Sequence, residues 1–128
     1  MGTRRLERVG QLVQAELARL LLSGVRDARL REVAISAVRM SADLRHARVY
    51  FRTLGDPAQQ DGLQAALEKA APFLRGEVGR ALGMRTVPDF IFAYDETPDA
   101  ARRIERLLQD VIPPGPSATT EDDEGDGE

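Results

Sequence analysis

The sequence predicts an α+β domain in which helices pack on one face of a three-stranded sheet. Three observations lead to this fold class. Apolar residues recur at spacings of three and four near both ends of the chain and in its middle, as in amphipathic helices. Two segments near residue 40 alternate apolar and polar residues, and a third short apolar segment follows Pro88. The 128 residues are enough for one domain with a hydrophobic core.

The first helix is predicted from its N-terminal apolar stripe. Thr3 is a suitable N-cap, and Ser23-Gly24 is a suitable end, because glycine tolerates the left-handed conformation that ends many helices. The stripe consists of residues spaced three or four apart: Leu6, Val9, Val13, Leu17, Leu20 and Leu21.

A β-hairpin is predicted next, from VAISAVRM, the turn SADLRH and ARVYFRTL. Successive side chains of a strand point to opposite faces, so Arg48, Tyr50 and Arg52 share one face of the second strand, opposite Val49 and Phe51. Three strands cannot cover themselves on both faces. We therefore expect the helices on the apolar face and an open arginine-bearing face. An ordinary solvated sheet face is the alternative interpretation.

Pro72 interrupts the helical pattern of the middle segment. Its ring has no N–H to donate to the carbonyl of Glu68 and clashes with that carbonyl, at a cost of roughly 3 kcal/mol in a straight helix. It also disfavours the α conformation at Ala71. We expect two helices that meet at an angle, the first ending near Ala70 and the second starting with Pro72 and running to about Leu82.

Such a break would create a new helix N terminus with unpaired N–H groups near Phe73, and helix N termini attract phosphates. Arg75, Arg80 and Arg85 follow closely in the sequence, so we predict a phosphate-binding corner there. The alternative is that Pro72 only turns the chain so that both helices pack on the sheet.

The third strand is predicted at about residues 90–94. Thr97-Pro98-Asp99 then supplies an N-cap, a first-position proline and a first-turn acid for the last helix. From residue 113 the chain contains mainly proline, glycine, serine, threonine and acid, so we expect a domain over residues 1–112 and a disordered acidic tail over 113–128.

The formal net charge of −3 conceals an uneven distribution. The tail holds six of the 21 acidic residues and no basic one, which leaves 18 basic and 15 acidic residues in the predicted domain. All the basic residues except Lys69 are arginines, whose planar guanidinium suits phosphate. Arginine codons are also favoured in genomes rich in G and C, so composition alone is a weak indication of a nucleic-acid partner.

Several function classes are excluded or disfavoured. The chain has no cysteine, so disulfides and thiolate chemistry are excluded and a cytoplasmic location is expected. It has no Gly-rich phosphate loop, and Asp95-Glu96 fits a turn better than an acid–base pair. No segment is apolar enough for a bilayer span or a signal peptide. We expect no catalysis, cofactor, metal or membrane, and a monomer.

Four segments together resemble the ribosome-binding factor A family, bacterial assembly factors of the small ribosomal subunit. They are RRLERVGQLVQAELARLL, VAISAVRMSADLRHARVYF, AAPFLRGEVGRALGMRTVPDFIFAYDET and RRIERLL, and the resemblance covers nearly all of residues 4–110. The third segment is the most specific, because FLR, LGMR, Pro88 and the F-x-x-D of Phe92 to Asp95 come together in the family's order.

The resemblance implies a variant of the type II KH fold, in which a kinked helix pair with an Ala-x-Gly motif replaces the usual Gly-x-x-Gly loop. The matching residues are Ala70, Ala71 and Pro72, so a proline stands in place of the glycine. The resemblance also implies a non-enzymatic factor that binds the immature 30S subunit and its 16S rRNA and assists late maturation. The family is associated with processing at the 5′ end of that RNA and with growth in the cold.

Seven residues are expected to contact RNA, and three others form a separate, weaker group. The weaker group is Arg4, Arg5 and Arg8, because the polar side of a helix is charged in any case. The alternative function is a protein-interaction module whose basic face binds an acidic partner without nucleic acid. The low aromatic content of 5% argues against base stacking, with Tyr50 the one ring singled out. The seven residues are Arg75, Arg80 and Arg85 at the corner, and Arg45, His46, Arg48 and Arg52 on or beside the open hairpin face.

Overall fold

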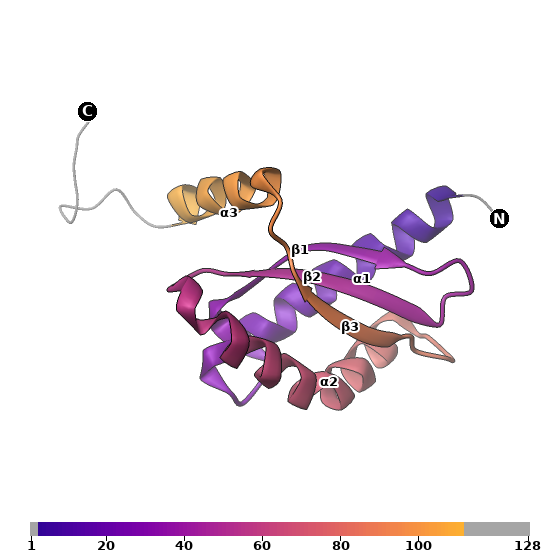
Figure 1. Cartoon of the computed structure of the whole chain (residues 1–128). Helices are drawn as coiled ribbons and strands as arrows, with labels where there is room; N and C mark the ends of the chain where they lie inside the picture. Colours follow the sequence, from indigo (N-terminus) through magenta and orange to yellow (C-terminus); the bar gives the residue numbers. More distant parts are fainter. Residues whose placement is uncertain (1–2, 112–128) are drawn as a thin grey trace. The chain divides into compact units, whose positions relative to one another are not determined.

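The computed structural model describes residues 3–111. The predicted tail, residues 113–128, lies outside the described residues. In chain order the elements are α1 (Thr3–Ser23), the 3-10 helix η1 (Ala28–Glu32), β1 (Val33–Met40), β2 (His46–Thr53), the 3-10 helix η2 (Pro57–Gln59), α2 (Gln60–Leu82), β3 (Asp89–Tyr94) and α3 (Pro98–Val111) (Figure 1).

The chain divides into two compact units, which are Met1–Glu96 and Thr97–Glu128. The second contains α3, whose start is as predicted: the Oγ1 of Thr97 accepts a hydrogen bond of 3.2 Å from the N–H of Ala100, which caps the helix. The domain boundary expected at residue 112 stays a prediction.

The sheet of the first unit has the strand order β1-β2-β3. β1 and β2 form an antiparallel hairpin, whereas β2 and β3 are parallel. A parallel pair requires a crossover connection, and α2 supplies it. The mixed α+β class and the three-stranded sheet are therefore as predicted.

One face of this sheet is covered by α1 and α2. In β2, Ala47, Val49, Phe51 and Thr53 are buried, while Arg48 is exposed on the other face, so the predicted alternation is confirmed. Figure 1 shows α1 behind the strands and α2 alongside them. The helices complete the core with a set of buried side chains: Val13, Leu17, Leu20 and Leu21 from α1, and Leu63, Leu67, Leu74 and Val78 from α2.

α2 is one continuous helix with Pro72 inside it, so the predicted break into two helices is wrong. The reason is that both halves bury side chains in the same core: Leu63 and Leu67 before the proline, Leu74 and Val78 after it. Each fully buried leucine contributes about 1.5–3 kcal/mol, and together they outweigh the proline's cost of about 3 kcal/mol. In Figure 1 the axis of α2 changes direction midway, as expected for a helix bent but not ended by proline.

The C terminus of α2 is formed by Gly83, whose φ of 65° lies in the left-handed region. Its N–H bonds to carbonyl oxygens of the last turn, and the N–H of Met84 donates to the carbonyl of Gly79 at 2.9 Å. This is the usual glycine termination of a helix. It turns the chain toward β3 and sets the position of the loop of residues 84–88.

Candidate nucleic-acid interface

Arg75 contacts the loop that enters β3. Its Nε donates to the carbonyl of Pro88 and its Nη2 to the carbonyl of Val87, both at 2.9 Å. The same Nη2 lies 3.4 Å from the Oδ1 of Asp89. The guanidinium therefore joins α2 to the start of β3, and these contacts use Nε and Nη2 of a side chain that was predicted to bind phosphate.

The phosphate-binding corner loses its physical basis in a continuous helix. Phe73 and Leu74 lie inside α2, more than ten residues from its N terminus at Gln60. No new helix N terminus is formed at Pro72, so that part of the prediction is wrong. RNA contact by the individual arginines stays a prediction.

The three arginines of the corner have different environments. Arg80 forms an ion pair with Glu77, one turn earlier on α2. Arg80 follows Arg75 by five positions, which places the two side chains about 140° apart around the helix axis. Arg85 lies beyond the end of α2 and lines a groove of about 350 Å³ together with Arg5 of α1. The structure thus does not present them as one row.

The open hairpin face is the side of the sheet away from the core. We define it by the residues that project from it: Arg39 of β1 and His46, Arg48, Tyr50 and Arg52 of β2. Arg39 and Arg48 are direct partners in the antiparallel register, and both are exposed. Directly opposed like charges destabilise a sheet. Neither arginine forms an ion pair with a carboxylate within residues 3–111, which leaves this pair available to an anion.

Arg39 was missed by the sequence analysis because a bulge reverses the alternation in β1. The register shifts between Ile35 and Ala37, so Ser36 is the extra residue. As a result Val33 and Val38 are both buried, although they lie an odd number of positions apart. The Oγ of Ser36 donates to Asp95 at 2.6 Å and fastens the bulge to the end of β3. Regular alternation would have placed residue 39 on the core side.

On this face, Arg52 contacts other residues of the protein. Its Nη1 donates to the carbonyl of Asp95 at 2.5 Å, and its guanidinium carbon lies 5.2 Å from the ring centre of Tyr94. That distance is typical of a cation–π contact. The ring of Tyr94 in turn meets Phe51 edge to face at 5.4 Å. Arg52 is therefore engaged at the far end of the face from the Arg39–Arg48 pair.

The hairpin turn adds two exposed basic side chains, Arg45 and His46. Asp43 organises the turn: its Oδ1 accepts from the Oγ of Ser41 at 2.7 Å and from the N–H of Arg45 at 3.0 Å. The hydrogen bond from Ser41, with the smaller effect of Arg45, lowers the pKa of Asp43 below its ordinary value. The turn lies at the same end of the hairpin as the Arg39–Arg48 pair.

Within residues 3–111, no group of three or more His, Cys, Asp or Glu side chains is arranged to hold a metal ion. None of the described helices is both long enough and apolar enough to cross a bilayer.

These features define a small α+β protein that buries one face of its sheet under two helices and presents basic residues on the other. The comparisons with known proteins agree with this class. The family model described as ribosome-binding factor A matches residues 5–108, and this chain belongs to the ribosome-binding factor A family. The resemblance noted from the sequence is thus confirmed.

Relatives from several bacteria match over most of their length. The ribosome-binding factor A of Heliobacterium modesticaldum is 41% identical over 111 residues, covering 87% of this chain and 92% of the relative. That of Thioalkalivibrio sulfidiphilus is 38% identical over 120 residues, covering 94% and 93%. The crystal structure of ribosome-binding factor A from Thermus thermophilus superposes with a TM-score of 0.60 at 29% identity, covering 73% of this chain and 94% of that one.

Proposed function

We propose that this protein is a non-enzymatic assembly factor that binds the immature small (30S) ribosomal subunit through its 16S rRNA. It assists late maturation of that RNA, including processing at the 5′ end, and a nuclease partner performs the cleavage. We further propose that it acts as a cytoplasmic monomer with a KH-like domain and supports growth in the cold. Membership of a family of ribosome-binding factors supports this proposal.

The Arg39–Arg48 pair is the observation that carries the RNA contact. Two neighbouring exposed guanidinium groups without a carboxylate partner in the described part of the chain repel each other. A phosphate backbone relieves this repulsion and accepts hydrogen bonds from both. Arg45 extends the positive charge around the turn, and the exposed His46 lies beside it. In this proposal Arg39, Arg48, Arg45 and His46 bind rRNA. The contacts of Arg52 and Arg75 instead stabilise the sheet and its connection to α2.

The alternative is an acidic protein partner on the same face. Exposed Ile91, the β3 neighbour of Arg48, offers such a partner a small apolar contact. Binding through several RNA phosphates weakens steeply with salt, since each neutralised phosphate releases counterions. Binding dominated by an apolar protein contact depends less on salt. Salt dependence therefore separates an RNA contact from a mainly apolar protein contact.

The test is co-sedimentation with purified small subunits at two salt concentrations, with circular dichroism as the check of folding. The variant is Arg39→Glu/Arg48→Glu, and the matched control is Arg31→Glu, an exposed arginine of η1 outside this face. We expect salt-sensitive binding by the wild type and the control, and its loss in the double variant.

Two results would contradict the proposal. Absence of wild-type binding would remove the assembly-factor function itself. Full binding by the folded Arg39→Glu/Arg48→Glu protein would remove the open hairpin face as the RNA contact. In that second case Arg80→Glu/Arg85→Glu would examine the remaining arginines of the original prediction.

A further inference from the structure

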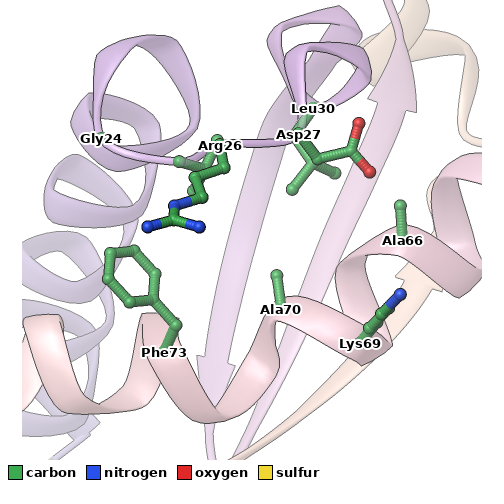
Figure 2. Close-up of a pocket in the computed structure, with 9 residues that line it drawn as sticks. Gly24, Arg26, Asp27, Leu30, Ala66, Lys69, Ala70 and Phe73 are labelled. Carbon is green, nitrogen blue, oxygen red and sulfur yellow. The ribbon is translucent and has the colours of Figure 1, made fainter.

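A pocket of about 710 Å³ lies between α2 and the segment that follows α1 (Figure 2). It is separate from the open hairpin face, since the residues that line it come from the 24–30 segment and from α2. Its volume is within the range of roughly 300–1,000 Å³ that is typical of small-ligand sites. Figure 2 shows Ala66, Ala70 and Phe73 rising from α2 toward the 24–30 segment.

The pocket exists because α2 has alanines where it faces Leu30. Ala66 and Ala70 lie one turn apart on the same side of the helix, and their methyl groups do not reach across to the 24–30 segment. Leu30, which also lines the pocket, is fully buried. Ala66 and Ala70 thus form an apolar floor of the pocket on the α2 side.

Phe73 forms one end of this floor, and it is 47% exposed, a large value for an aromatic ring. Tyr50, the one ring singled out from the sequence, is half-buried. A ring left this exposed beside an apolar floor offers a stacking surface. Unpaired nucleobases use such surfaces, because every base has a flat π face.

Positive charge borders the pocket. Arg26 and Lys69 are both exposed, and Figure 2 shows the side chain of Arg26 extending toward Phe73. The nearby carboxylate of Asp27 is already occupied, since Arg29 donates to it with Nε at 3.1 Å and Nη2 at 2.8 Å. This contact is the main cause of the lowered pKa of Asp27, and the charge of Lys69 makes a smaller contribution to it. Neither Arg26 nor Lys69 forms an ion pair with a carboxylate within residues 3–111.

We propose that this pocket binds one unpaired nucleotide of the rRNA, with its base stacked on Phe73 above the alanine floor and its phosphate held by Arg26 and Lys69. The inference rests on the proposed function and adds a second RNA contact. An apolar floor, an exposed ring and two cations that form no ion pair in the described part of the chain together match a nucleotide, which combines a flat apolar base with an anion. An acidic apolar peptide is the competing ligand.

A photo-crosslink identifies the ligand directly. Photoreactive benzoylphenylalanine in place of Phe73 is irradiated in the complex of the full-length protein with small subunits. The same residue in place of Leu22 is the control, because Leu22 is exposed at 67% and does not line the pocket. We expect a crosslink to 16S rRNA from position 73 and none from position 22.

Affinity is the second measurement. Phe73→Leu keeps an apolar side chain but removes the ring, and we expect it to weaken subunit binding at least about 5-fold, the lower limit for loss of one stacked base. Arg26→Gln/Lys69→Gln should weaken it as well and flatten its salt dependence. Leu22→Ala and Arg31→Gln, the matched controls, should bind as the wild type does.

The outcomes that overturn this inference differ from those that overturn the proposed function. Crosslinking of position 73 to a ribosomal protein would assign the pocket to a protein ligand. Absence of a crosslink together with unchanged affinity of Phe73→Leu, in a protein that still co-sediments, would overturn the pocket and leave the proposed function standing. Only failure of the wild type to co-sediment would overturn both.

Discussion

The Nε of Arg75, in the middle of α2, donates a hydrogen bond of 2.9 Å to the carbonyl oxygen of Pro88, directly before β3. Its Nη2 reaches Val87 in the same way. One guanidinium thereby satisfies two consecutive carbonyl groups of a loop that has no secondary structure of its own. Arg75, three residues after Pro72, thus holds the loop that leads into β3, an edge strand of the sheet.

Arg75→Ala is therefore predicted to lower the free energy of unfolding by about 1.5–3 kcal/mol, the range for hydrogen bonds to a charged group. Arg75→Lys should recover less than half of this loss, because an ammonium cannot reproduce the planar fork. Urea unfolding followed by circular dichroism measures both. Arg80→Ala is the control, and loss of its exposed pair with Glu77 should change stability by less than about 1 kcal/mol. Equal stability of Arg75→Ala and the wild type would contradict the structural role.

Pro72→Ala is predicted to raise the free energy of unfolding by about 1–3 kcal/mol, because alanine restores the N–H that bonds to the carbonyl of Glu68. Pro72→Gly should be about 1 kcal/mol less stable than Pro72→Ala. Thermal and urea unfolding of the three proteins give the order. If Pro72→Ala is instead less stable than the wild type, the bend is needed to place both halves of α2 in the core.

Two helical glycines should respond to alanine in opposite directions. At Gly76 an added Cβ meets nothing within 4 Å, so Gly76→Ala should stabilise the protein by about 0.5–1 kcal/mol. At Gly10 the added Cβ would lie 2.7 Å from the carbonyl oxygen of Val38, so Gly10→Ala should destabilise it by about 1–3 kcal/mol. The same urea titration measures both. Similar effects at the two sites would contradict the close approach of α1 to β1.

Leu44 has a φ of 61°, a left-handed conformation that is uncommon for a leucine. Leu44→Gly and Leu44→Ala both remove the side chain beyond Cβ and differ only in that atom. The glycine variant should therefore be about 1–2 kcal/mol more stable than the alanine variant. Equal midpoints of thermal unfolding would show that the turn relaxes without cost.

Each arginine of the Arg39–Arg48 pair should carry its own share of the salt dependence. Arg39→Gln and Arg48→Gln are each predicted to reduce the slope of log affinity against log salt by about 0.7–0.9, the value for one phosphate contact. Fluorescence anisotropy of labelled protein with small subunits, over a salt series, gives these slopes. Arg31→Gln should leave the slope unchanged. An unchanged slope in both variants would point to a contact elsewhere.

Local pattern was sufficient for α1, for the hairpin of β1 and β2 and for the start of α3, but not for the course of α2. The apolar stripe of the first helix predicted α1 within its observed bounds, and the period of two predicted which residues of β2 are buried. The Thr97 cap predicted the start of α3. These features follow from the sequence alone, because helix and strand periods determine which side chains can share a buried face.

The tertiary structure determined which groups the basic residues contact. The bulge at Ser36 places Arg39 on the open hairpin face, and Ser36 donates a hydrogen bond to Asp95, which is 59 residues away. The guanidinium of Arg75 donates to carbonyl groups 12 and 13 residues further along the chain. The burial of Leu67 and Leu74 in one core kept α2 continuous through its proline. Charge, composition and the family's motifs indicated a ribosome-binding factor. Which arginines remain available to bind RNA was determined only by long-range contacts, because a guanidinium donates to whichever oxygen the folded chain brings within reach.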